Sequence, residues 1–447
     1  MNKVYDVCVI GGGPAGAALA LRLAKLGRRA ILIERDAFPR LHVGESLTGG
    51  TLPLLEVLGV RDAMENAGFL AAPRATVLWA GQLRLRETHG GYQVNRGIFD
   101  ALLLNAARRA GVEVRQPALI IHSVHDNTRW TLTLRTGETI HARFLGDASG
   151  RSRFLPGARG RIGATSLALY AYWSEVDAQD GGTIVEAADS HWYWGAPLPG
   201  GLFNATIIVD PSANRLDRYL DLIRKSRLLG KRLADGHWGE VSACTATPFL
   251  DESPVSDRFI KVGDAALSID PLSSQGVQTA IGTALHAAVV INTIIDHPER
   301  TDLAIKFYRC RLRSSSIFHA ASAQTFYREQ FAISATDFWR KRAGETLARE
   351  ATALKKPLRP EQQIRLADGI SFVPVPTVNE HHVIATEGVE RNGQTNVFVA
   401  GASVGALLKE IDRPMLAREL LRRWKCILPA ERAIQTLQWA WTEGWIE

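Results

Sequence analysis

The chain has few cysteines and no segment with the pattern of a membrane anchor. Only four of its 447 residues are cysteines, and they are far apart with no C-x-x-C pair. We therefore expect reduced thiols in the core and no metal site. No uncharged apolar run reaches the ~18 residues of a membrane-spanning helix. The first residues lead directly into a strand with no signal peptide, so a cytoplasmic protein is expected.

The chain also has only a small excess of charge of one sign. The chain carries 53 Lys and Arg against 46 Asp and Glu, a net charge of +7. This mild excess and the lack of a dense basic stripe argue against a nucleic-acid partner. The length allows two or three domains, and no internal repeat or low-complexity run is found.

The first 34 residues carry the most specific pattern. A buried parallel strand, Val7–Ile10, is followed by Gly11, Gly13 and Gly16 at G-x-G-x-x-G spacing, and a helix is expected over Ala15–Leu26. The first glycine permits a tight turn, the second lets a pyrophosphate approach the backbone, and the third lets helix and strand pack closely. The N–H groups that start the helix would face the phosphates.

An acidic residue completes this pattern. A second strand, Ala30–Ile33, ends at Glu34, about 20 residues after the glycines, where a carboxylate binds ribose hydroxyls. Three glycines alone could form a chance loop, but strand, glycines, helix, strand and acid in this order indicate a dinucleotide site. An acid at this position favours an unphosphorylated ribose, and thus FAD or NAD.

Three later segments are candidates to meet the nucleotide. Arg40, Glu45 and Ser46 lie in a loop that could line a flavin, although Ser46 could equally cap the next helix. Arg96 opens a helix and is a candidate partner for a phosphate or a ring, whereas a surface arginine is the simpler interpretation. Asp147 ends a short apolar strand, where it could reach the nucleotide or only close a turn.

A second strand that ends in Gly-Asp strengthens the prediction. Phe259–Val262 leads to Asp264, a turn at Pro271 follows, and Gly276 and Val277 begin an apolar helix. The N-terminus of such a helix can stabilise negative charge on a flavin ring or bind an anion.

The most unusual stretch is HWYWGAPLP, which contains Trp192, Trp194 and Pro197. It falls in a second sheet that could roof a planar ligand. Without further context, an aromatic cross-strand core cluster is the simpler interpretation.

Helical and strand patterns divide the chain further. Residues 214–240 are predicted to form a helix, and KKPLRP at 355–360 a linker. Arginines and tryptophans near the end suit a protein interface, but a terminal helix docked on the main body explains them equally well. We expect an α/β protein with a Rossmann-type domain (1–165 and 255–300), an antiparallel-sheet substrate domain (75–95 and 166–254), a helical region (301–360) and a small C-terminal α+β, winged-helix-like module (361–447).

These motifs resemble the flavin monooxygenase superfamily that shares the para-hydroxybenzoate hydroxylase fold, and most closely its flavin-dependent halogenase branch. WYWGAP at 192–197 is similar to the W-x-W-x-I-P signature of halogenases, with Ala196 in place of isoleucine. The other matching motifs are GGGPAG (11–16), ER (34–35), FPR (38–40) running into GESL (44–47), Arg96 with FD (99–100), GDASG (146–150), GDAA (263–266) and DPLSSQGV (270–277).

The resemblance implies FAD as the cofactor. It assigns the ADP half to the glycines and Glu34, the pyrophosphate and ribityl region to Arg96 and Asp264, and the flavin ring to Ser46 and the start of the helix at Gly276. The implied catalytic residues are Glu45, Trp192, Trp194 and Pro197. The implied FAD-binding residues are Gly11, Gly13, Pro14, Ala15, Gly16, Glu34, Arg35, Arg40, Ser46, Arg96, Asp264, Pro271, Gly276 and Val277.

One halogenase residue is missing. In that branch a lysine follows a Gly-Phe pair, precedes A-T-x-x-x-W and handles hypohalous acid, but here Ala72 stands at that position of GFLAAPRATVLW. Arg74 remains a cation and cannot readily form a chloramine-like adduct. The resemblance without this lysine implies an FAD-dependent monooxygenase, in which a flavin C4a-hydroperoxide formed with O2 hydroxylates an electron-rich aromatic ring such as indole.

The extra C-terminal module gives a narrower resemblance, to flavoprotein monooxygenases that dihydroxylate a peptidyl tryptophan in cysteine tryptophylquinone biogenesis, during quinohemoprotein amine dehydrogenase maturation. This implies a tryptophan-bearing polypeptide docked by the tail. With no second G-x-G-x-x-G, electrons would come from transiently bound NAD(P)H or a flavin reductase. Other functions stay open: a halogenase of an indole, pyrrole or phenol with a relocated lysine, a geranylgeranyl-reductase-like flavoprotein, or a non-catalytic FAD protein that docks a partner.

Overall fold

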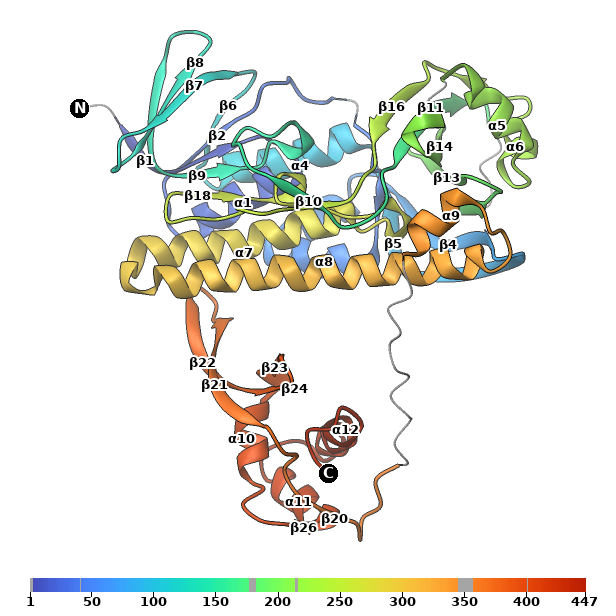
Figure 1. The fold of residues 1–447 in the computed structure, drawn as a ribbon. Helices are drawn as coiled ribbons and strands as arrows, with labels where there is room; N and C mark the ends of the chain where they lie inside the picture. Colours follow the sequence, from blue (N-terminus) through green and yellow to red (C-terminus); the bar gives the residue numbers. More distant parts are fainter. Residues whose placement is uncertain (1–2, 41, 177–181, 214–215, 345–356, 400) are drawn as a thin grey trace. The chain divides into compact units, whose positions relative to one another are not determined.

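The computed structural model describes residues 3–40, 42–176, 182–213, 216–344, 357–399 and 401–447 (Figure 1). The chain forms two compact units, Met1–Glu345 and Thr346–Glu447. Each unit has a buried hydrophobic core of its own, and we describe them in turn.

The first sheet of unit 1 has seven strands and contains the parallel strands expected from the sequence. β1 (Val4–Ile10) pairs in parallel with β2 (Ala30–Ile33) and β9 (Thr139–Asp147). Ile10 pairs with Ile33, so the glycines after β1 and Glu34 after β2 lie at the same sheet edge. The other strands are β6 (Glu113–Arg115), β7 (Ile120–His125), β8 (Trp130–Leu134) and β18 (Phe259–Lys261).

The second sheet has nine strands, in the order β15–β11–β14–β13–β12–β4–β5–β3 with β16 beside β11. Its neighbouring strands are antiparallel, as predicted, except that β4 and β12 are parallel. The strands are β3 (Ser46–Leu47), β4 (Leu70–Trp79), β5 (Gln82–Gln93), β11 (Leu167–Ser174), β12 (Thr183–Ala187), β13 (Trp192–Leu198), β14 (Leu202–Val209), β15 (His237–Trp238) and β16 (Ser242–Thr245). A smaller sheet consists of β10 (Arg159–Arg161), β17 (Phe249–Asp251) and β19 (Leu267–Ser268).

The prediction of one helix over residues 214–240 is wrong. Residues 214–215 lie outside the described residues, and the rest holds two short helices, α5 (Tyr219–Lys225) and α6 (Leu229–Arg232). The buried Glu186 carboxylate of β12 causes the break, because it accepts hydrogen bonds from Ser226 Oγ and the next two backbone N–H groups, at 2.5 to 2.9 Å. This tertiary contact overrides the local helical pattern.

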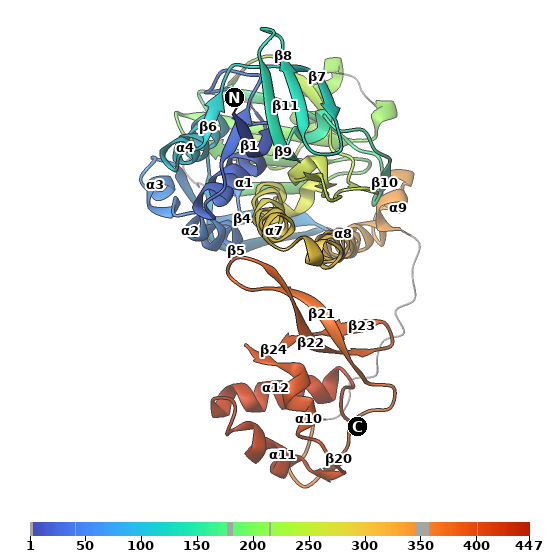
Figure 2. The same cartoon turned by 90° about the vertical axis from the view of Figure 1, so that its left-hand side faces the viewer.

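Four longer helices cover the first sheet and its surroundings. α1 (Pro14–Lys25) packs against α4 (Arg96–Arg109) and α7 (Gly276–Asp296), and α7 lies beside α8 (Thr301–Phe331) in both views (Figures 1 and 2). Contrary to the expectation from the sequence, α7 is long and apolar enough to cross a membrane, but 61% of its apolar window is buried inside the protein. Its apolar residues therefore serve internal packing. Shorter helices of unit 1 are α2 (Leu52–Val57), α3 (Arg61–Glu65) and α9 (Asp337–Ala343).

The four cysteines are free, as expected, but they are not all in the core. Cys8 is buried in β1, whereas Cys310 and Cys426 are exposed. The prediction of core thiols is wrong for these two, since they lie on outward faces of α8 and of the turn after α11 (Ala417–Trp424).

Unit 2 is a small α+β module. Its main sheet is formed by β21 (Ser371–Val378), β22 (Val383–Arg391) and β23 (Gln394–Asn396), and Trp424 and Trp445 lie in its core. The other elements are β20 (Gln363–Ile364), β24 (Phe398–Val399), β25 (Ala402–Ser403), α10 (Val404–Lys409), β26 (Met415–Leu416), α11 and α12 (Ala430–Thr442). The predicted linker at 355–360 falls partly outside the described residues. The likeness of unit 2 to a winged helix stays a prediction.

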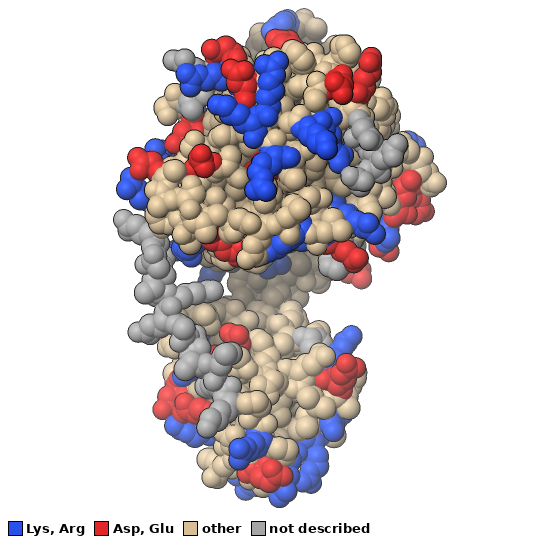
Figure 3. All heavy atoms as spheres, turned by 90° about the vertical axis from the view of Figure 1, so that its right-hand side faces the viewer, with Lys and Arg blue, Asp and Glu red and all other residues tan. Residues whose placement is uncertain are grey.

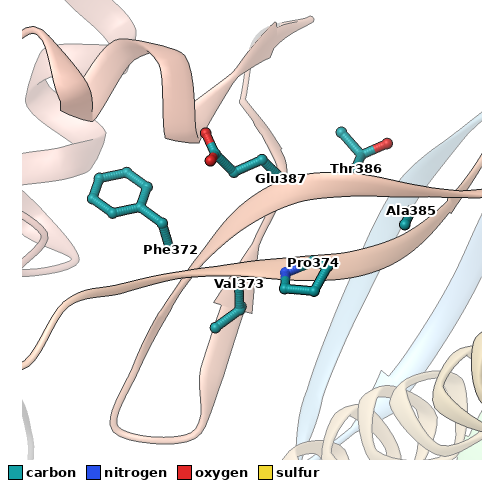
Figure 4. A pocket seen from close by; sticks show the side chains of 6 residues that line it. All are labelled: Phe372, Val373, Pro374, Ala385, Thr386 and Glu387. Atoms are coloured by element: carbon teal, nitrogen blue, oxygen red, sulfur yellow. The ribbon is translucent and has the colours of Figure 1, made fainter.

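The surface of unit 2 has a small hollow on the β21–β22 hairpin, of about 190 Å³. Figure 4 shows its lining residues, Phe372, Val373, Pro374, Ala385, Thr386 and Glu387. On the face drawn in Figure 3, basic and acidic side chains are both present on each unit, with uncharged surface between them.

Candidate functional site

A cavity of about 860 Å³ opens at the carboxyl edge of the parallel sheet in unit 1. Its walls come from the loops after β1, β2 and β9, from the start of α7, and from β11, β13 and β14 of the second sheet. Gly16 and Pro197 are not part of this lining. The predicted site residues that do line it are Gly11, Gly13, Pro14, Ala15, Glu34, Arg35, Arg40, Glu45, Ser46, Arg96, Trp192, Trp194, Asp264, Pro271, Gly276 and Val277.

The three glycine positions favour glycine for different structural reasons. Gly11 has φ +101°, and a Cβ there would lie 2.4 Å from the Ala148 carbonyl oxygen. A Cβ on Gly16 would lie 1.8 Å from the Gly11 oxygen, so this glycine permits close packing of helix and strand. Gly13 is not crowded: its nearest neighbour would be Arg40 Nη2 at 3.6 Å, and the space beside it belongs to the cavity. A side chain at Gly13 would fill the place where a pyrophosphate approaches the backbone.

The start of α1 is suited to hold an anion. Gly13 is its N-cap, Pro14 is its first residue, and no side chain among the described residues caps it. The first N–H groups of a helix lack intrahelical acceptors and carry partial positive charge. Arg40 Nη1 lies 3.3 Å from Asp36 and lines the cavity close to this helix end. These groups fit the pyrophosphate of a dinucleotide.

Glu34 closes the other wall of the nucleotide end. It is 3% exposed, and its carboxylate accepts hydrogen bonds from the N–H groups of Gly12 at 2.5 Å and Asp36 at 2.8 Å. These bonds fix the carboxylate in the cavity wall, and each oxygen keeps further acceptor capacity. The position fits the ribose contact expected for this acid.

Arg96 lines the cavity, but most of its hydrogen bonds are internal. Its guanidinium forms a two-point ion pair with Asp100, at 3.0 and 3.2 Å, and donates to the carbonyls of Val43 and Gly44. Burial alone would lower the pKa of Arg96, but Asp100 raises it above its ordinary value. Arg96 therefore orders the 43–46 loop beside the cavity in addition to any contact with the cofactor.

Glu45 is held in that same loop. Its carboxylate accepts hydrogen bonds from Tyr172 Oη at 2.6 Å, Asn204 Nδ2 at 3.2 Å and its neighbour Gly44 N–H at 2.8 Å. Burial and the Glu45 charge raise the pKa of Tyr172, so this hydroxyl stays a donor. The geometry makes Glu45 an anchor between the loop and the second sheet.

Ser46 and Asp147 resolve two alternatives left open by the sequence. Ser46 belongs to β3, pairs with Gln93 and lines the cavity, so it is not a helix cap. Asp147 lies outside the cavity lining, and its carboxylate accepts from Ser149 N–H at 3.0 Å and Leu155 N–H at 2.8 Å. It shapes the turn that carries Ala148 to the cavity.

The start of α7 lies at the far end of the nucleotide region. Pro271, Gly276 and Val277 line the cavity there, and Gln275 caps α7 without a side-chain hydrogen bond. The positive end of this 21-residue helix therefore points at the cavity and can stabilise negative charge on a ring. Asp264 lies nearby in the lining, in an ion pair with Arg151 at 3.1 Å.

The two tryptophans of β13 play unequal parts. Trp192 is 1% exposed and packs in an aromatic core cluster with Trp79, Tyr327 and Trp339, while one surface lines the cavity. Trp194 is less buried, and neither Trp192 Nε1 nor Trp194 Nε1 has a hydrogen-bond acceptor among the described residues. The core-cluster interpretation thus holds for Trp192, while both rings face the cavity.

Several residues of the site were not predicted from the sequence. Tyr170, Thr206, Arg151 and Asp270 line the cavity. The first two are polar residues in apolar strands and carry no motif, so only the pairing of β11, β14 and β13 brings them together. Asp270 stands in the quoted motif DPLSSQGV, where its place before proline was the only available signal.

The structure, like the sequence, shows no lysine at the position of Ala72 or among the described residues of the cavity lining. Ala72 is buried in β4 opposite Gly91, and none of the described residues that line the cavity is a lysine. The cations of the lining are arginines, which keep their proton.

Known proteins resemble this chain in sequence and in fold. A family model for an FAD binding domain matches residues 4–194. The tryptophan 2-halogenase of Chondromyces crocatus is 30% identical over 366 residues, which cover 74% of this chain and 69% of that protein. The chain belongs to the flavin-dependent halogenase and monooxygenase family. It is a flavin-dependent oxidoreductase, and FAD is its cofactor.

Two solved structures of this family extend the likeness to the whole chain. The flavin-dependent halogenase CmlS has a TM-score of 0.86 at 24% identity, with 99% of this chain and 96% of that chain covered, and it shares the fold. QhpG, a peptidyl tryptophan dihydroxylase essential for tryptophylquinone cofactor biogenesis, has a TM-score of 0.77 at 25% identity, with 99% and 100% covered.

Proposed function

We propose that this flavoprotein is a monooxygenase that hydroxylates an indole ring, in a tryptophan carried by a polypeptide. The observation that carries the proposal is one continuous cavity, in which an FAD-type nucleotide end leads to an aromatic end lined by Trp192 and Trp194, with no lysine among the described lining residues. Bound FAD, once reduced, supplies an activated oxygen atom from O2 to an electron-rich ring.

The residues of the chain supply positioning and exclusion of water. Trp192, Trp194 and Tyr170 offer flat apolar surfaces on which a second aromatic ring packs in offset or edge-to-face geometry. The start of α7 offers positive potential where a reduced ring carries negative charge. Removal of water from such a cavity protects the reactive oxygen species from side reactions.

QhpG supports a polypeptide as the substrate, because it acts on a peptidyl tryptophan and is covered over its full length. Unit 2 is the proposed docking module, and NAD(P)H or a flavin reductase the proposed electron source. Removal of residues 345–447 should leave FAD bound and free indoles turned over, while turnover of a polypeptide falls roughly 100-fold through loss of effective concentration. Equal turnover of the polypeptide by both forms would end the docking hypothesis.

A halogenase is the second candidate, favoured by the 30% identity with a tryptophan 2-halogenase. It would need an amine in the cavity that the described lining residues do not provide. Reactions run with bromide decide the point: brominated product at the rate of oxygen consumption would favour this candidate.

The decisive experiment uses isotopically heavy oxygen gas. The FAD-loaded protein, a reductant and a tryptophan-bearing peptide would be incubated under this gas, and the product analysed by mass spectrometry. One or two labelled oxygen atoms on tryptophan are expected. Oxygen consumption with hydrogen peroxide as the sole product, for peptides and free indoles alike, would overturn the proposal.

A further inference from the structure

Asp270 contributes a carboxylate to the cavity wall, and none of the FAD contacts described above involves it. It precedes the 3₁₀ turn Pro271–Ser273, is partly buried and contributes surface to the cavity, whose lining also contains Trp192 and Trp194. A partly buried carboxylate near aromatic side chains needs partners, since burial of an unpaired charge is costly.

Its hydrogen bonds leave room for one more donor. Tyr327 Oη of α8 donates to this carboxylate, 2.9 Å from Oδ1 and 3.0 Å from Oδ2, and Leu272 N–H donates to Oδ1 at 3.0 Å. A carboxylate has about four lone-pair sites, and these two donors occupy only part of them. The carboxylate can therefore accept a further hydrogen bond, and Asp270 belongs to the cavity lining.

The groups around Asp270 hold it in place. Tyr327 is 2% exposed, with its ring 6.2 Å from Trp79 and 6.0 Å from Trp339, so its hydroxyl has a fixed position. The charged group that faces Asp270 from α9 is Arg342, which is itself paired with Asp210 at 2.9 Å. Burial raises the pKa of Asp270, and the bonds from Leu272 and Tyr327 and the charge of Arg342 oppose that rise.

Resting on the proposed function, we propose that Asp270 binds the ring N–H of the indole substrate and accepts its proton during oxygen transfer, with Tyr327 as the positioning residue. As the new C–O bond forms, the O–O bond of the O2-derived oxidant that reduced FAD would supply breaks, and its electron pair leaves with the other oxygen atom. Positive charge then develops on the ring and makes the N–H acidic. The N–H bond breaks, its electron pair stays with the ring, and the proton moves to Asp270. When the attacked carbon loses its C–H proton to water, Asp270 returns the proton to nitrogen and is a carboxylate again.

A purely structural role is the alternative, because Asp270 caps the 3₁₀ turn and binds Tyr327. Asp270→Asn separates the two roles. An asparagine oxygen still accepts from Leu272 and Tyr327, and asparagine is an equally good N-cap, but it carries no charge and accepts no proton.

The first test measures binding to the oxidised FAD-loaded protein and requires no turnover. Isothermal titration would compare 3-methylindole, which has a ring N–H, with 1,3-dimethylindole, which lacks it. For each form of the protein, the dissociation constant of 1,3-dimethylindole is divided by that of 3-methylindole. This ratio should fall roughly tenfold in Asp270→Asn, because the variant loses a charge-assisted hydrogen bond to the ring N–H. The methyl group that distinguishes the two ligands is the same for both forms of the protein. An unchanged ratio would overturn the inference, whatever reaction the protein performs.

The second test uses Tyr327→Phe with Tyr308→Phe as its matched control. Both tyrosines are buried in α8 and donate the proton of their hydroxyl to a single residue, but Tyr308 Oη donates to the Lys261 carbonyl at 2.7 Å, away from the cavity. Loss of the Tyr327 hydroxyl removes a bond to the charged carboxylate, so the pKa of Asp270 rises further. The preference for a ring N–H, present above that pKa and lost as pH falls through it, should then disappear at a higher pH in Tyr327→Phe than in the wild type or Tyr308→Phe. Equal pH profiles would contradict the positioning role.

Turnover separates this inference from the proposed function. Asp270→Asn should keep its FAD and its oxygen consumption, while labelled product falls roughly 100-fold and hydrogen peroxide rises. Failure of the wild type to label any indole refutes the proposed function alone, and the binding ratio still decides the role of Asp270. Full labelling by Asp270→Asn would refute the proton transfer alone.

Discussion

The two ends of the cavity differ in the groups that form them, which are mainly backbone at one end and side chains at the other. The nucleotide end depends mainly on backbone: the turn at Gly11, the open face at Gly13 and the uncapped start of α1. Charged side chains such as Glu34 and Arg40 complete it. The aromatic end consists of side chains from β11, β13, β14 and the turn at Asp270. A backbone site depends on conformation, which few residue types permit, whereas a side-chain site depends on which strands happen to pair.

This difference explains what each end tolerates. A substitution at the nucleotide end alters a conformation or fills a space that the cofactor needs, so its effects are large. A substitution at the aromatic end removes one contact among several and is expected to act on the substrate while the cofactor stays bound.

The largest expected effect is loss of FAD in Gly13→Val. A side chain at Gly13 meets no protein atom nearer than 3.6 Å at its Cβ, so the fold should persist, but it occupies the place of the pyrophosphate. Flavin absorbance after gel filtration would measure the FAD retained, and circular dichroism the fold. Stoichiometric flavin in this variant would refute the assignment of the nucleotide end.

Gly16→Val provides the contrast at the same end. Its Cβ would lie 1.8 Å from the Gly11 oxygen, so the strand and helix must separate and we expect loss of folded protein as well as loss of FAD. If both variants unfolded alike, the distinction between an open and a crowded glycine would be wrong.

The residues that the structure brings together at the nucleotide end could be selected from the sequence, whereas those at the aromatic end could be selected only in part, for the same physical reason. The positions of Gly11, Gly13, Gly16 and Glu34 follow from local spacing, and the structure brings them to one sheet edge through the pairing of β1 and β2. Asp270 and Tyr327 are separated by 57 residues, and no local pattern links a residue before proline with a tyrosine in a long helix. The prediction of one helix over 214–240 failed for the same reason, because the residue that breaks the helix, Glu186, lies in a strand far from it in the sequence.

Arg96→Gln tests the loop that joins the two ends. Glutamine leaves Asp100, which is 0% exposed, without its cationic partner, and the loss should be about 3 to 5 kcal/mol in the free energy of unfolding. Urea denaturation would measure it. Arg61→Gln, which removes the exposed ion pair with Glu65 in the same unit, is the control and should cost only about 0.5 kcal/mol. Similar values for the two variants would contradict the structural role given to Arg96.

Trp194→Leu should act on the aromatic end alone. The ring lines the cavity and its N–H has no acceptor among the described residues, so the loss of an aromatic contact is expected to raise KM for an indole roughly two- to tenfold. The dissociation constant for FAD should not change. Flavin titration and steady-state kinetics on the same preparation separate the two quantities, and a parallel loss of FAD would mean that the two ends are not independent.

The smallest expected effect on binding belongs to Tyr172→Phe, where the two ends meet. The variant removes the 2.6 Å hydrogen bond to Glu45 but keeps the ring, and Glu45 Oε1 retains Asn204 as a donor. Because the bond joins a neutral donor to a charged acceptor, we expect a loss of about 1.5 to 3 kcal/mol in unfolding free energy, less the part that Asn204 recovers. The nucleotide end shares no atom with this contact, so the affinity for FAD should stay within twofold of the wild type. A large loss of FAD affinity in this variant would show that the loop at Glu45 transmits side-chain changes to the backbone site, and the cavity would then act as one unit.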